Sequence, residues 1–290
     1  MADSHMASPQ LLLGILGHPL AQTMSPILHT WAFAMKKVNG QYSVWDTPPE
    51  ELSAFMQTLR SVPYSGASVT IPHKEAVIPF LDGLTNTAKN IGAVNTIFWE
   101  QGRLLGHNTD MEGFLSPLSG LEPPQMALVL GAGGAARAVL AGLASVGATR
   151  VAITARSTAK AEKLATDFSP LFTSITVTPW EERLLSVPEQ NASFWAINTT
   201  PMGMRGKAEG QSPLPADWFA AQTGKNRLAY DLVYNPLETT FLAFAKRAGW
   251  QCRDGLEMFV AQGAAQFRCW TGQDIPVAQA KTMLIRHLAG

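Results

Sequence analysis

The stretch MALVLGAGGAARAVLAGLASVG, residues 126–147, limits the possible folds of this chain more than any other. An apolar run, a glycine-rich turn and a run of small residues follow one another, as in a buried strand joined tightly to a closely packed helix. Unpaired N–H groups at the start of such a helix bind a pyrophosphate. The stretch therefore predicts a dinucleotide site, with an ordinary strand–helix turn as the alternative. The expected cofactor-binding residues are Gly131, Ala132, Gly133, Gly134 and Ala135.

Short apolar strands alternate with amphipathic helices from Leu11 to about Trp250. This alternation predicts an α/β fold, because βαβ units place helices between the parallel strands of a sheet. A break at SGLEPPQ, residues 119–125, separates two such patterns. We therefore expect two domains, with C-terminal helices returning to the first. The expected limits are 9–109 for the first domain, 119–236 for a Rossmann-type second domain, and 250–290 for the returning helices.

Within the first domain, strands are expected at LLLGILG, QYSVWDT and GASVTI. Ser25 and Pro26 are typical of the N-cap and the first residue of a helix. Pro72 is similarly placed to begin a second helix over PHKEAVIPFLDG, with Thr70 able to help cap it. The run AVNTIFWEQGRLLGHNT predicts a hairpin with a Gln-Gly turn, and a helix over about 110–118 follows it.

Charge and composition argue against several classes of protein. Lys plus Arg and Asp plus Glu both number 22, so the formal net charge is zero, whereas a nucleic-acid-binding domain needs a clustered basic face. No apolar run reaches the roughly 20 residues of a membrane span. Residues 1–8, MADSHMAS, resemble an expression-tag remnant, and without a signal peptide a cytoplasmic location is expected. We expect no metal site, because no zinc-type spacing is formed by Cys252, Cys269, His18, His29, His73 or His107.

The strand that follows the glycine-rich helix favours NADP over NAD. Sites for NAD usually have an acidic residue there, which binds the ribose 2′-hydroxyl. VAITARSTAK has none, and offers instead Arg156, Ser157, Thr158 and Lys160. A guanidinium, hydroxyls and an ammonium suit a 2′-phosphate. The alternative is that the two cations are only solvated at a helix start.

Lys74 is unusual because it would lie in the first turn of the helix that begins at Pro72. The positive end of the helix dipole disfavours an ammonium and would ease the loss of its proton. A lysine so placed can exchange a proton near neutral pH, although a solvated surface cation is the alternative. Polar groups also gather at two strand ends, with Asn95 in GAVNT and Asp110 in GHNTDMEG. A carboxylate near Lys74 would orient it, while helix capping is the alternative for residues 108–110.

In order along the chain, SVTIPHK, GAVNT, HNTD, GAGGAAR, NTTPMGM, YDLVYNP and DGLEMFVAQGAAQF resemble the shikimate dehydrogenase family over about residues 12–272. The resemblance implies an α/β substrate domain and a Rossmann NADP domain joined by helices. It implies an enzyme that reversibly reduces 3-dehydroshikimate to shikimate with NADPH, in the pathway to aromatic amino acids. The expected partner is this small molecule, without nucleic acid or membrane, and the expected state is a monomer or homodimer.

The resemblance also assigns roles to individual residues. It matches Lys74 to the family's catalytic lysine and Asp110 to its partner aspartate, which would meet across a groove and handle the proton on the substrate C3 oxygen. Met202 and Gly203 resemble residues on the nicotinamide side. Hydroxyl groups matching Thr23 and Ser25 would bind the substrate carboxylate. The full set of expected substrate-binding residues is Thr23, Ser25, Thr70, Asn95, Tyr234 and Gln262.

Three positions depart from the family pattern. Thr23 stands where the family usually has serine, and its extra methyl group bears on tolerance at C1, where quinate carries a hydroxyl. Ser68 stands where Asn is frequent, a change expected to be structural. Ala155 precedes Arg156 where the family commonly has Asn, which removes one polar contact to NADP.

Other functions stay open at this point. A quinate/shikimate dehydrogenase with relaxed specificity is the nearest alternative. A non-catalytic NADP-binding module is another, although the presence of both Lys74 and Asp110 argues against it. A dehydrogenase of the same scaffold that acts on an amino analogue of shikimate is a third.

Overall fold

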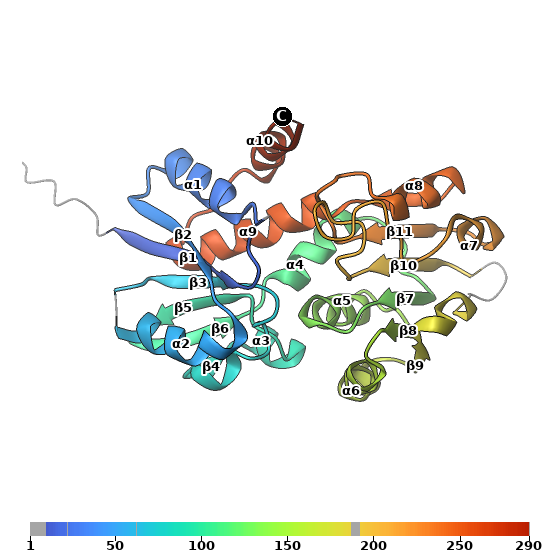
Figure 1. Cartoon of the computed structure of the whole chain (residues 1–290), viewed down its shortest axis with the longest axis horizontal. Coiled ribbons are helices and arrows are strands. Elements are labelled where there is room, and N and C mark those ends of the chain that lie inside the picture. The colour runs from blue at the N-terminus through green and yellow to red at the C-terminus, as the bar shows by residue number, and fades with distance from the viewer. Residues whose placement is uncertain (1–9, 22, 62, 187–191, 290) are drawn as a thin grey trace, which may run out of the picture. The chain divides into compact units, whose positions relative to one another are not determined.

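The computed structural model describes residues 10–21, 23–61, 63–186 and 192–289, so the expected tag remnant at 1–8 lies outside the described residues. The chain divides into two compact units, each built on its own sheet (Figure 1). Unit 1 comprises residues 1–109 and 263–287, and unit 2 comprises 110–262 with 288–290. The expected α/β class is confirmed, since strands and helices alternate in both units.

The sheet of unit 1 has the order β2-β1-β3-β5-β6-β4 among the described residues. Its strands are β1 (Leu11–Gly17), β2 (Gly40–Asp46), β3 (Gly66–Val69), β4 (Gly83–Leu84), β5 (Thr96–Glu100) and β6 (Arg103–His107). The N-terminal part of the chain adds helices α1 (Ser25–Lys36), α2 (Leu52–Ser61) and α3 (Asn86–Ile91), with short 3₁₀ turns at Pro49–Glu51 and Ile78–Phe80. The expected strands are confirmed, but β4 and α3 were not predicted.

C-terminal segments complete unit 1, although only residues 263–287 of the expected 250–290 belong to it. The second part of α9 (Gly255–Thr271) and most of α10 (Val277–Ala289) belong to it. Gln266 of α9 accepts a hydrogen bond from the Ser68 hydroxyl of β3 at 2.8 Å. Trp270 of α9 donates from its indole N–H to the carbonyl of Ile97 in β5 at 3.0 Å. Side chains from the far end of the chain therefore bind the central strands of the first sheet.

The expectation of parallel sheets is wrong for unit 1, where the sheet is mixed. β1 pairs in parallel with β2 and β3, whereas β5 is antiparallel to both β3 and β6. The predicted hairpin is the reason: Gln101 and Gly102 have φ of 50° and 75° and turn β5 directly into β6. A two-residue turn can join only antiparallel strands.

Two predicted helix starts in unit 1 are wrong. Ser25 is the first residue of α1 and not its N-cap, which is Met24. Its hydroxyl is engaged elsewhere, in a side-chain hydrogen bond with Tyr42. At the second start, no α-helix begins at Pro72, because residues 71–77 form turns that lead into the 3₁₀ turn at Ile78–Phe80.

Contacts from another part of the sheet explain why the Lys74 segment is not helical. In an α-helix the carbonyl of Lys74 would accept from the N–H of Ile78. It accepts instead from Val94 at 2.7 Å, and the N–H of Ile78 donates to Glu75 at 3.3 Å. Pro79 would also disfavour a helical conformation at the residue before it. Lys74 therefore lies on a turn, and the dipole argument based on a helix start does not apply to it.

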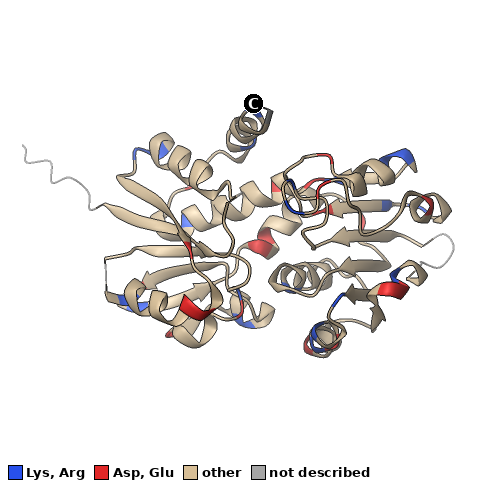
Figure 2. Cartoon of the chain, in the orientation of Figure 1, with Lys and Arg blue, Asp and Glu red and all other residues tan. Residues whose placement is uncertain are grey.

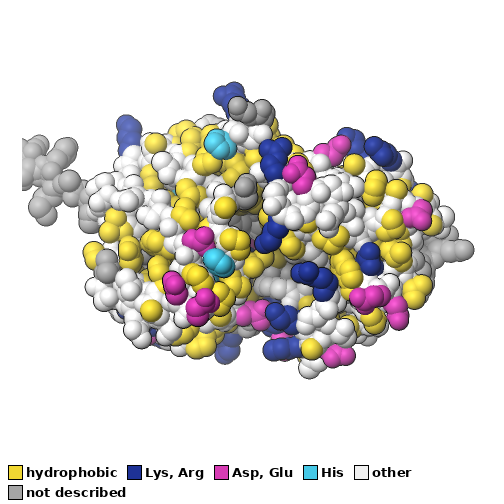
Figure 3. Space-filling model, viewed as in Figure 1, with side chains coloured by type: hydrophobic (Ala, Val, Ile, Leu, Met, Phe, Trp, Pro, Cys, Tyr) yellow, Lys and Arg dark blue, Asp and Glu magenta, His cyan; other side chains and the backbone are white. Residues whose placement is uncertain are grey.

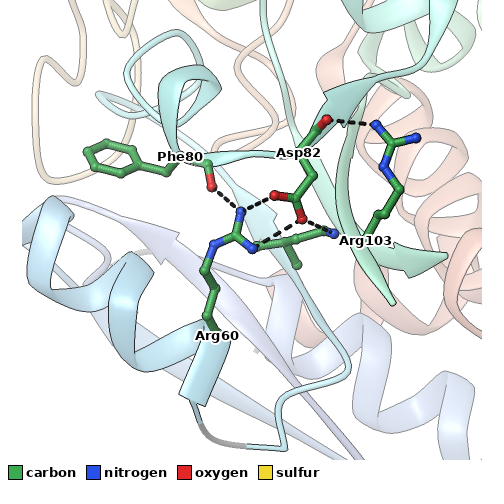
Figure 4. A network of polar contacts seen from close by, with 5 residues as sticks. Arg60, Phe80, Asp82 and Arg103 are labelled. Carbon is green, nitrogen blue, oxygen red and sulfur yellow. Dashed lines mark hydrogen bonds and ion pairs between the residues drawn. The ribbon is translucent and has the colours of Figure 1, made fainter. Parts of the chain in front are cut away.

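A surface network fixes the chain that follows this turn (Figure 4). The guanidinium of Arg60 in α2 donates to both carboxylate oxygens of Asp82, at 2.9 and 3.1 Å, and to the carbonyl of Phe80 at 2.7 Å. Asp82 also accepts from the backbone N–H of Leu104 at 2.7 Å, and its carbonyl accepts from Arg103 at 2.8 Å. The network thus joins α2, the segment after Lys74 and β6.

The sheet of unit 2 is parallel, with the order β12-β11-β10-β7-β8-β9 among the described residues. Read from β9, this is the strand order of a doubly wound dinucleotide-binding domain. The chain runs outward from β7 in one direction and then returns to its other side at β10. The strands are β7 (Met126–Leu130), β8 (Arg150–Ala155), β9 (Ser174–Pro179), β10 (Phe194–Asn198), β11 (Arg227–Asp231) and β12 (Gln251–Arg253).

Helices cover both faces of this second sheet. Ala127 and Val129 of β7 pack in one core cluster with side chains of α5 and α6, whereas Leu128 and Leu130 pack in another with side chains of α7 and α8. Alternate residues of a strand point to opposite faces, so a strand covered on both sides is apolar throughout. The helices are α4 (Asp110–Leu115), α5 (Gly134–Ser145), α6 (Thr158–Phe168), α7 (Ala216–Ala221), α8 (Thr240–Arg247) and the first part of α9.

Most of unit 2 agrees with the predicted elements. The expected helix over about 110–118 is present as α4, followed by a 3₁₀ turn at Ser116–Leu118. Prediction missed β9, α7, β12 and the 3₁₀ turns at Ser169–Leu171 and Trp180–Leu185. β9 has exposed residues at alternate positions and lies at the sheet edge, where the apolar pattern is weak.

Candidate functional site

The predicted substrate residues of unit 1 gather at one edge of its sheet. Thr70 and Lys74 follow the end of β3, and Asn95 immediately precedes β5. Because β5 is antiparallel to β3, with Ser68 opposite Thr96, the start of one strand lies beside the end of the other. Thr23 and Ser25 follow β1, whose end pairs with the end of β3. Distant parts of the sequence therefore meet at this edge.

Backbone contacts bring the Lys74 turn and Asn95 together. The carbonyl of Lys74 accepts from Val94, the residue before Asn95. The Asn95 side chain is buried and uses both of its polar atoms: Nδ2 donates to the Thr109 hydroxyl at 2.8 Å, and Oδ1 accepts from the Thr109 N–H at 2.8 Å. His73 is also buried, with Nε2 at 2.7 Å from the carbonyl of Thr47. The turn is thus held on two sides.

A buried chain of hydrogen bonds, which was not predicted from the sequence, supports this edge. The Tyr42 hydroxyl donates to Ser68 at 2.6 Å, Ser68 donates to Gln266, and Gln266 donates to the carbonyl of Asn95 at 2.8 Å. Burial raises the pKa of Tyr42, opposed by side-chain hydrogen bonds with Ser68 and Ser25. These hydrogen bonds therefore link two predicted substrate residues, Ser25 at one end and Asn95 at the other. Ser68 departs from the family pattern, and the structural role expected for it agrees with these buried hydrogen bonds of its hydroxyl.

His29 packs beside the same chain of hydrogen bonds. Its ring stacks on Tyr42 with centroids 4.5 Å apart and meets Trp270 edge-on at 5.2 Å. Burial lowers the pKa of His29 to about 3, with the Gln266 side chain opposing the shift. A histidine that is neutral across the physiological range and stacked on Tyr42 fits a packing role.

In unit 2, the glycine turn has the geometry that a dinucleotide needs. Gly131 has φ of 120°, a value that favours glycine, and a Cβ atom there would collide with the hydroxyl of Thr199. Gly133 is the N-cap of α5, and nothing lies within 4 Å of the place where a side chain would project. The start of α5 thus has open space beside Gly133 and no capping side chain on its first N–H groups, which fits a pyrophosphate.

The expected phosphate-reading segment follows β8 directly. Arg156, Ser157, Thr158 and Lys160 are all exposed at the turn into α6. Ser157 is the N-cap of α6, and its hydroxyl accepts from the N–H of Lys160 at 3.4 Å. A hydroxyl that accepts can still donate, so capping leaves Ser157 a proton for a phosphate oxygen. Two cations and free hydroxyl protons at this turn fit a 2′-phosphate.

Met202 and Gly203 lie in the loop after β10, beside the glycine turn. The loop is tied to β7 by Thr199, whose N–H and hydroxyl both donate to the carbonyl of Leu130, at 2.9 and 2.8 Å. Asn198 donates to the carbonyl of Met202 at 3.2 Å. Asn198 was not predicted as a site residue, although a polar residue that closes the apolar strand FWAIN is a usable signal.

The remaining predicted residues of unit 2 are Asp110 of α4, Gln262 of α9 and Tyr234 of the loop after β11. Asp110 begins α4 and is buried. Gly113, one turn later, lies so close to α9 that a Cβ atom there would be 2.8 Å from the Cβ of Gln262. Gln262 donates to the carbonyl of Phe259 at 2.8 Å, and the ring of Tyr234 lies 4.6 Å from that of Phe259. One region of unit 2 therefore contains Gln262, Tyr234 and the start of α4.

The predicted meeting of Lys74 with Asp110 stays a prediction. Lys74 belongs to unit 1 and Asp110 to unit 2. Within its own unit, each lies on a well-fixed backbone next to other predicted site residues.

Charged side chains are spread over both units. Figure 2 shows Lys and Arg interspersed with Asp and Glu along helices and loops, while most strands carry neither. On the face seen in Figure 3, both signs of charge lie among apolar side chains.

Within residues 10–289, apart from the gaps noted above, no group of three or more His, Cys, Asp or Glu could hold a metal ion. In the same described part, no helix is long and apolar enough to cross a membrane.

Comparison with known families gives matches along most of the chain. Residues 15–97 match the family described as shikimate dehydrogenase substrate binding domain. Residues 121–200 match shikimate / quinate 5-dehydrogenase, and 255–282 match the shikimate 5′-dehydrogenase C-terminal domain.

Individual relatives match over nearly their full lengths. Shikimate dehydrogenase (NADP(+)) of Oleidesulfovibrio alaskensis is 45% identical, with 97% of each chain covered. The structure of shikimate 5-dehydrogenase from Thermus thermophilus with NADP(H) and shikimate has a TM-score of 0.79 at 37% identity, covering 95% of this chain and 99% of that one. Quinate dehydrogenase from Corynebacterium glutamicum with NAD has a TM-score of 0.84 at 25% identity, covering 96% and 100%.

Proposed function

The chain belongs to the shikimate dehydrogenase family, and we propose that it catalyses the reversible, NADP-dependent reduction of 3-dehydroshikimate to shikimate. One observation carries the proposal beyond family membership: unit 2 has an open glycine turn at a helix start, followed after the next strand by Arg156 and Lys160 and no acidic residue. Relatives named as NADP enzymes and the arrangement of unit 1 support it further.

The proposed roles follow the chemistry of each side chain. NADPH, when bound, supplies the hydride that reduces the substrate at C3. Lys74 donates a proton to the C3 oxygen during reduction and accepts it during oxidation. The carboxylate of Asp110 stabilises the positive charge of the lysine. Thr23 and Ser25 bind the substrate carboxylate through their hydroxyls. Further hydrogen bonds to the substrate come from Thr70, Asn95, Tyr234 and Gln262.

The cofactor roles belong to unit 2. The N–H groups of the Gly131–Ala135 turn bind the pyrophosphate, and Arg156 to Lys160 bind the 2′-phosphate. Met202 and Gly203 line the nicotinamide side. We assign substrate binding to residues 9–109 with the helices of 250–290, and NADP binding to 119–236. A cytoplasmic location and a monomeric or homodimeric state remain part of the proposal.

A matrix of steady-state rates tests the function. Shikimate and quinate are each measured with NADP⁺ and NAD⁺, and kcat/KM is compared. We expect the highest value for shikimate with NADP⁺, because the Arg156 turn offers cations to a 2′-phosphate. A strong preference for quinate with NAD⁺ would contradict the proposal. Activity only on an amino analogue of shikimate would identify a different dehydrogenase of this scaffold.

Relaxed specificity for quinate is the second candidate, and Thr23 is the observation that favours it. Thr23→Ser removes only the methyl group that is expected near C1. A change in the quinate-to-shikimate ratio of kcat/KM in this variant would attribute tolerance at C1 to that methyl. An unchanged ratio would leave Thr23 without a role in specificity.

A further inference from the structure

The loop that carries Met202 and Gly203 is held by a buried amide. Asn198, at the end of β10, is fully buried and uses both of its polar atoms. Nδ2 donates to the Met202 carbonyl at 3.2 Å and to Asp231 at 2.9 Å. Oδ1 accepts from the N–H of Thr200 at 3.0 Å and from its hydroxyl at 2.7 Å. Four hydrogen bonds thus connect one side chain to the loop and to the neighbouring strand.

Asp231 helps to fix the orientation of this amide. A carboxylate only accepts hydrogen bonds, so it requires the NH₂ end of Asn198 to face it. If the amide were reversed, its oxygen would face the carboxylate and its NH₂ group would face the N–H of Thr200. Asp231 therefore requires the same orientation of Asn198 as the Met202 carbonyl and the Thr200 N–H do.

Asp231 is itself held in place on its other sides. It is fully buried at the end of β11, where one carboxylate oxygen also accepts from the N–H of Val233 at 3.0 Å. The other oxygen accepts from the Thr239 hydroxyl at 2.6 Å. Thr239 also lies against the loop, because a Cβ atom at Gly203 would be 3.2 Å from its Cβ. Asp231 thus bonds to two side chains that lie against the loop, those of Asn198 and Thr239.

A buried carboxylate at this position has a cost for the fold. Burial raises the pKa of Asp231 to about 7, while hydrogen bonds from Thr239, Val233 and Asn198 oppose the shift. An apolar residue would avoid this desolvation. Local features that oppose stability are more often found at functional sites.

We propose that Asp231 is a positioning residue for the nicotinamide end of the cofactor, acting through Asn198 and Thr239 on the course of residues 199–203. This inference rests on the proposed function, because Met202 and Gly203 are assigned to the nicotinamide side there. Asp231 does not touch the cofactor in this scheme. Its hydrogen bonds keep the loop beside the glycine turn, to which Thr199 is already tied through Leu130.

The test compares Asp231→Ala with Asp231→Asn. Alanine removes both acceptor oxygens, whereas asparagine keeps Oδ1 as the acceptor for Asn198 and Val233 and can use Nδ2 to donate to the Thr239 hydroxyl, which reverses that bond. For Asp231→Ala we expect the Kd for NADP⁺ to rise about tenfold and kcat to fall, with the KM for shikimate little changed. Asp231→Asn is expected to remain within about threefold of wild type. Equal losses in the two variants would contradict a role based on these hydrogen bonds.

A fragment of the cofactor separates positioning from general damage. 2′,5′-ADP lacks the nicotinamide, so its Kd is expected to be the same in Asp231→Ala and wild type. Equal weakening of 2′,5′-ADP and NADP⁺ would overturn the proposal. If wild type binds neither ligand, the proposed function fails, and not this inference alone.

Two more variants control for stability. Thr154 is buried in β8, with a hydroxyl that has no hydrogen-bond partner among the described residues, and Thr154→Val should change neither ligand's Kd. Thr239→Val removes one bond to Asp231 and the N-cap bond from Leu242 at the start of α8, but keeps the methyl group near Gly203, and a smaller loss for NADP⁺ alone is expected. If Asp231→Ala does not fold, Thr239→Val decides: an unchanged Kd and kcat would overturn the proposal.

Discussion

At the residue scale, Lys74 is placed by backbone bonds from distant parts of the chain. Its carbonyl accepts from Val94, and the preceding His73 is anchored through its ring to Thr47. The Lys74 side chain takes no part in these backbone bonds. Truncating that side chain should therefore leave both of these anchors of the turn intact, which makes Lys74 suitable for a test of its proposed role.

We predict that Lys74→Ala lowers kcat by about 10²–10⁴-fold while shikimate still binds, since a positioned general acid or base contributes about that much. Steady-state kinetics and a shikimate binding measurement would check both parts. Lys89→Ala, at an exposed position of α3 in the same unit, is the control and should match wild type. Turnover that is unaffected by Lys74→Ala would remove this lysine from the mechanism and leave room for a non-catalytic NADP-binding module.

At the element scale, α2, the segment after Lys74 and β6 are joined by the network around Asp82 (Figure 4). Hydrogen bonds from Arg60, then from the N–H of Leu104, lower the pKa of Asp82. A carboxylate whose pKa is depressed in the folded state contributes stability above its unfolded value of 3.8. That contribution is lost as the pH falls through the lower, folded value.

Asp82→Asn should therefore melt below wild type at pH 7, and the difference should shrink as the pH falls below about 4. Thermal melts of both proteins, at pH 7 and at the lowest pH where wild type still unfolds cooperatively, would measure this. Glu238→Gln is a matched control, because it removes an exposed ion pair, the one with Lys246. Unlike the Asp82 network, that pair includes no hydrogen bond to the backbone among those described. A loss as large in the control would mean that the network adds nothing beyond one surface ion pair.

At the scale of the whole molecule, the chain consists of two units with separate sheets and cores. A ligand stabilises the part to which it binds, so the cofactor proposal has a thermal consequence. NADP⁺ at about 100 times its Kd should stabilise the folded chain by about 2.7 kcal/mol. For a unit of this size, that corresponds to about 5–10 °C in melting temperature.

Calorimetry with NADP⁺, with NAD⁺ at the same concentration and without ligand would check this expectation. We predict a clear shift with NADP⁺ and a smaller one with NAD⁺, because NAD⁺ lacks the 2′-phosphate expected to meet Arg156 and Lys160. Shifts of equal size would argue against that segment as a reader of the 2′-phosphate.

Local chemistry in the sequence determined a large part of this protein. The glycine turn after β7, the Gln101-Gly102 hairpin and the helix that begins at Asp110 were all predicted, because each depends on residues close together in the chain. The motifs that carry the family resemblance are also short and local. Full-length relatives confirm that family.

Tertiary structure alone decided the rest. The N–H of Val94 donates to the carbonyl of Lys74, so this segment forms a turn, although the local sequence favoured a helix. Ser68 and Gln266, 198 positions apart, form one hydrogen bond beneath the predicted substrate residues. Propensity and periodicity describe neighbours in the chain, whereas a buried polar atom must find its partner wherever the fold provides one.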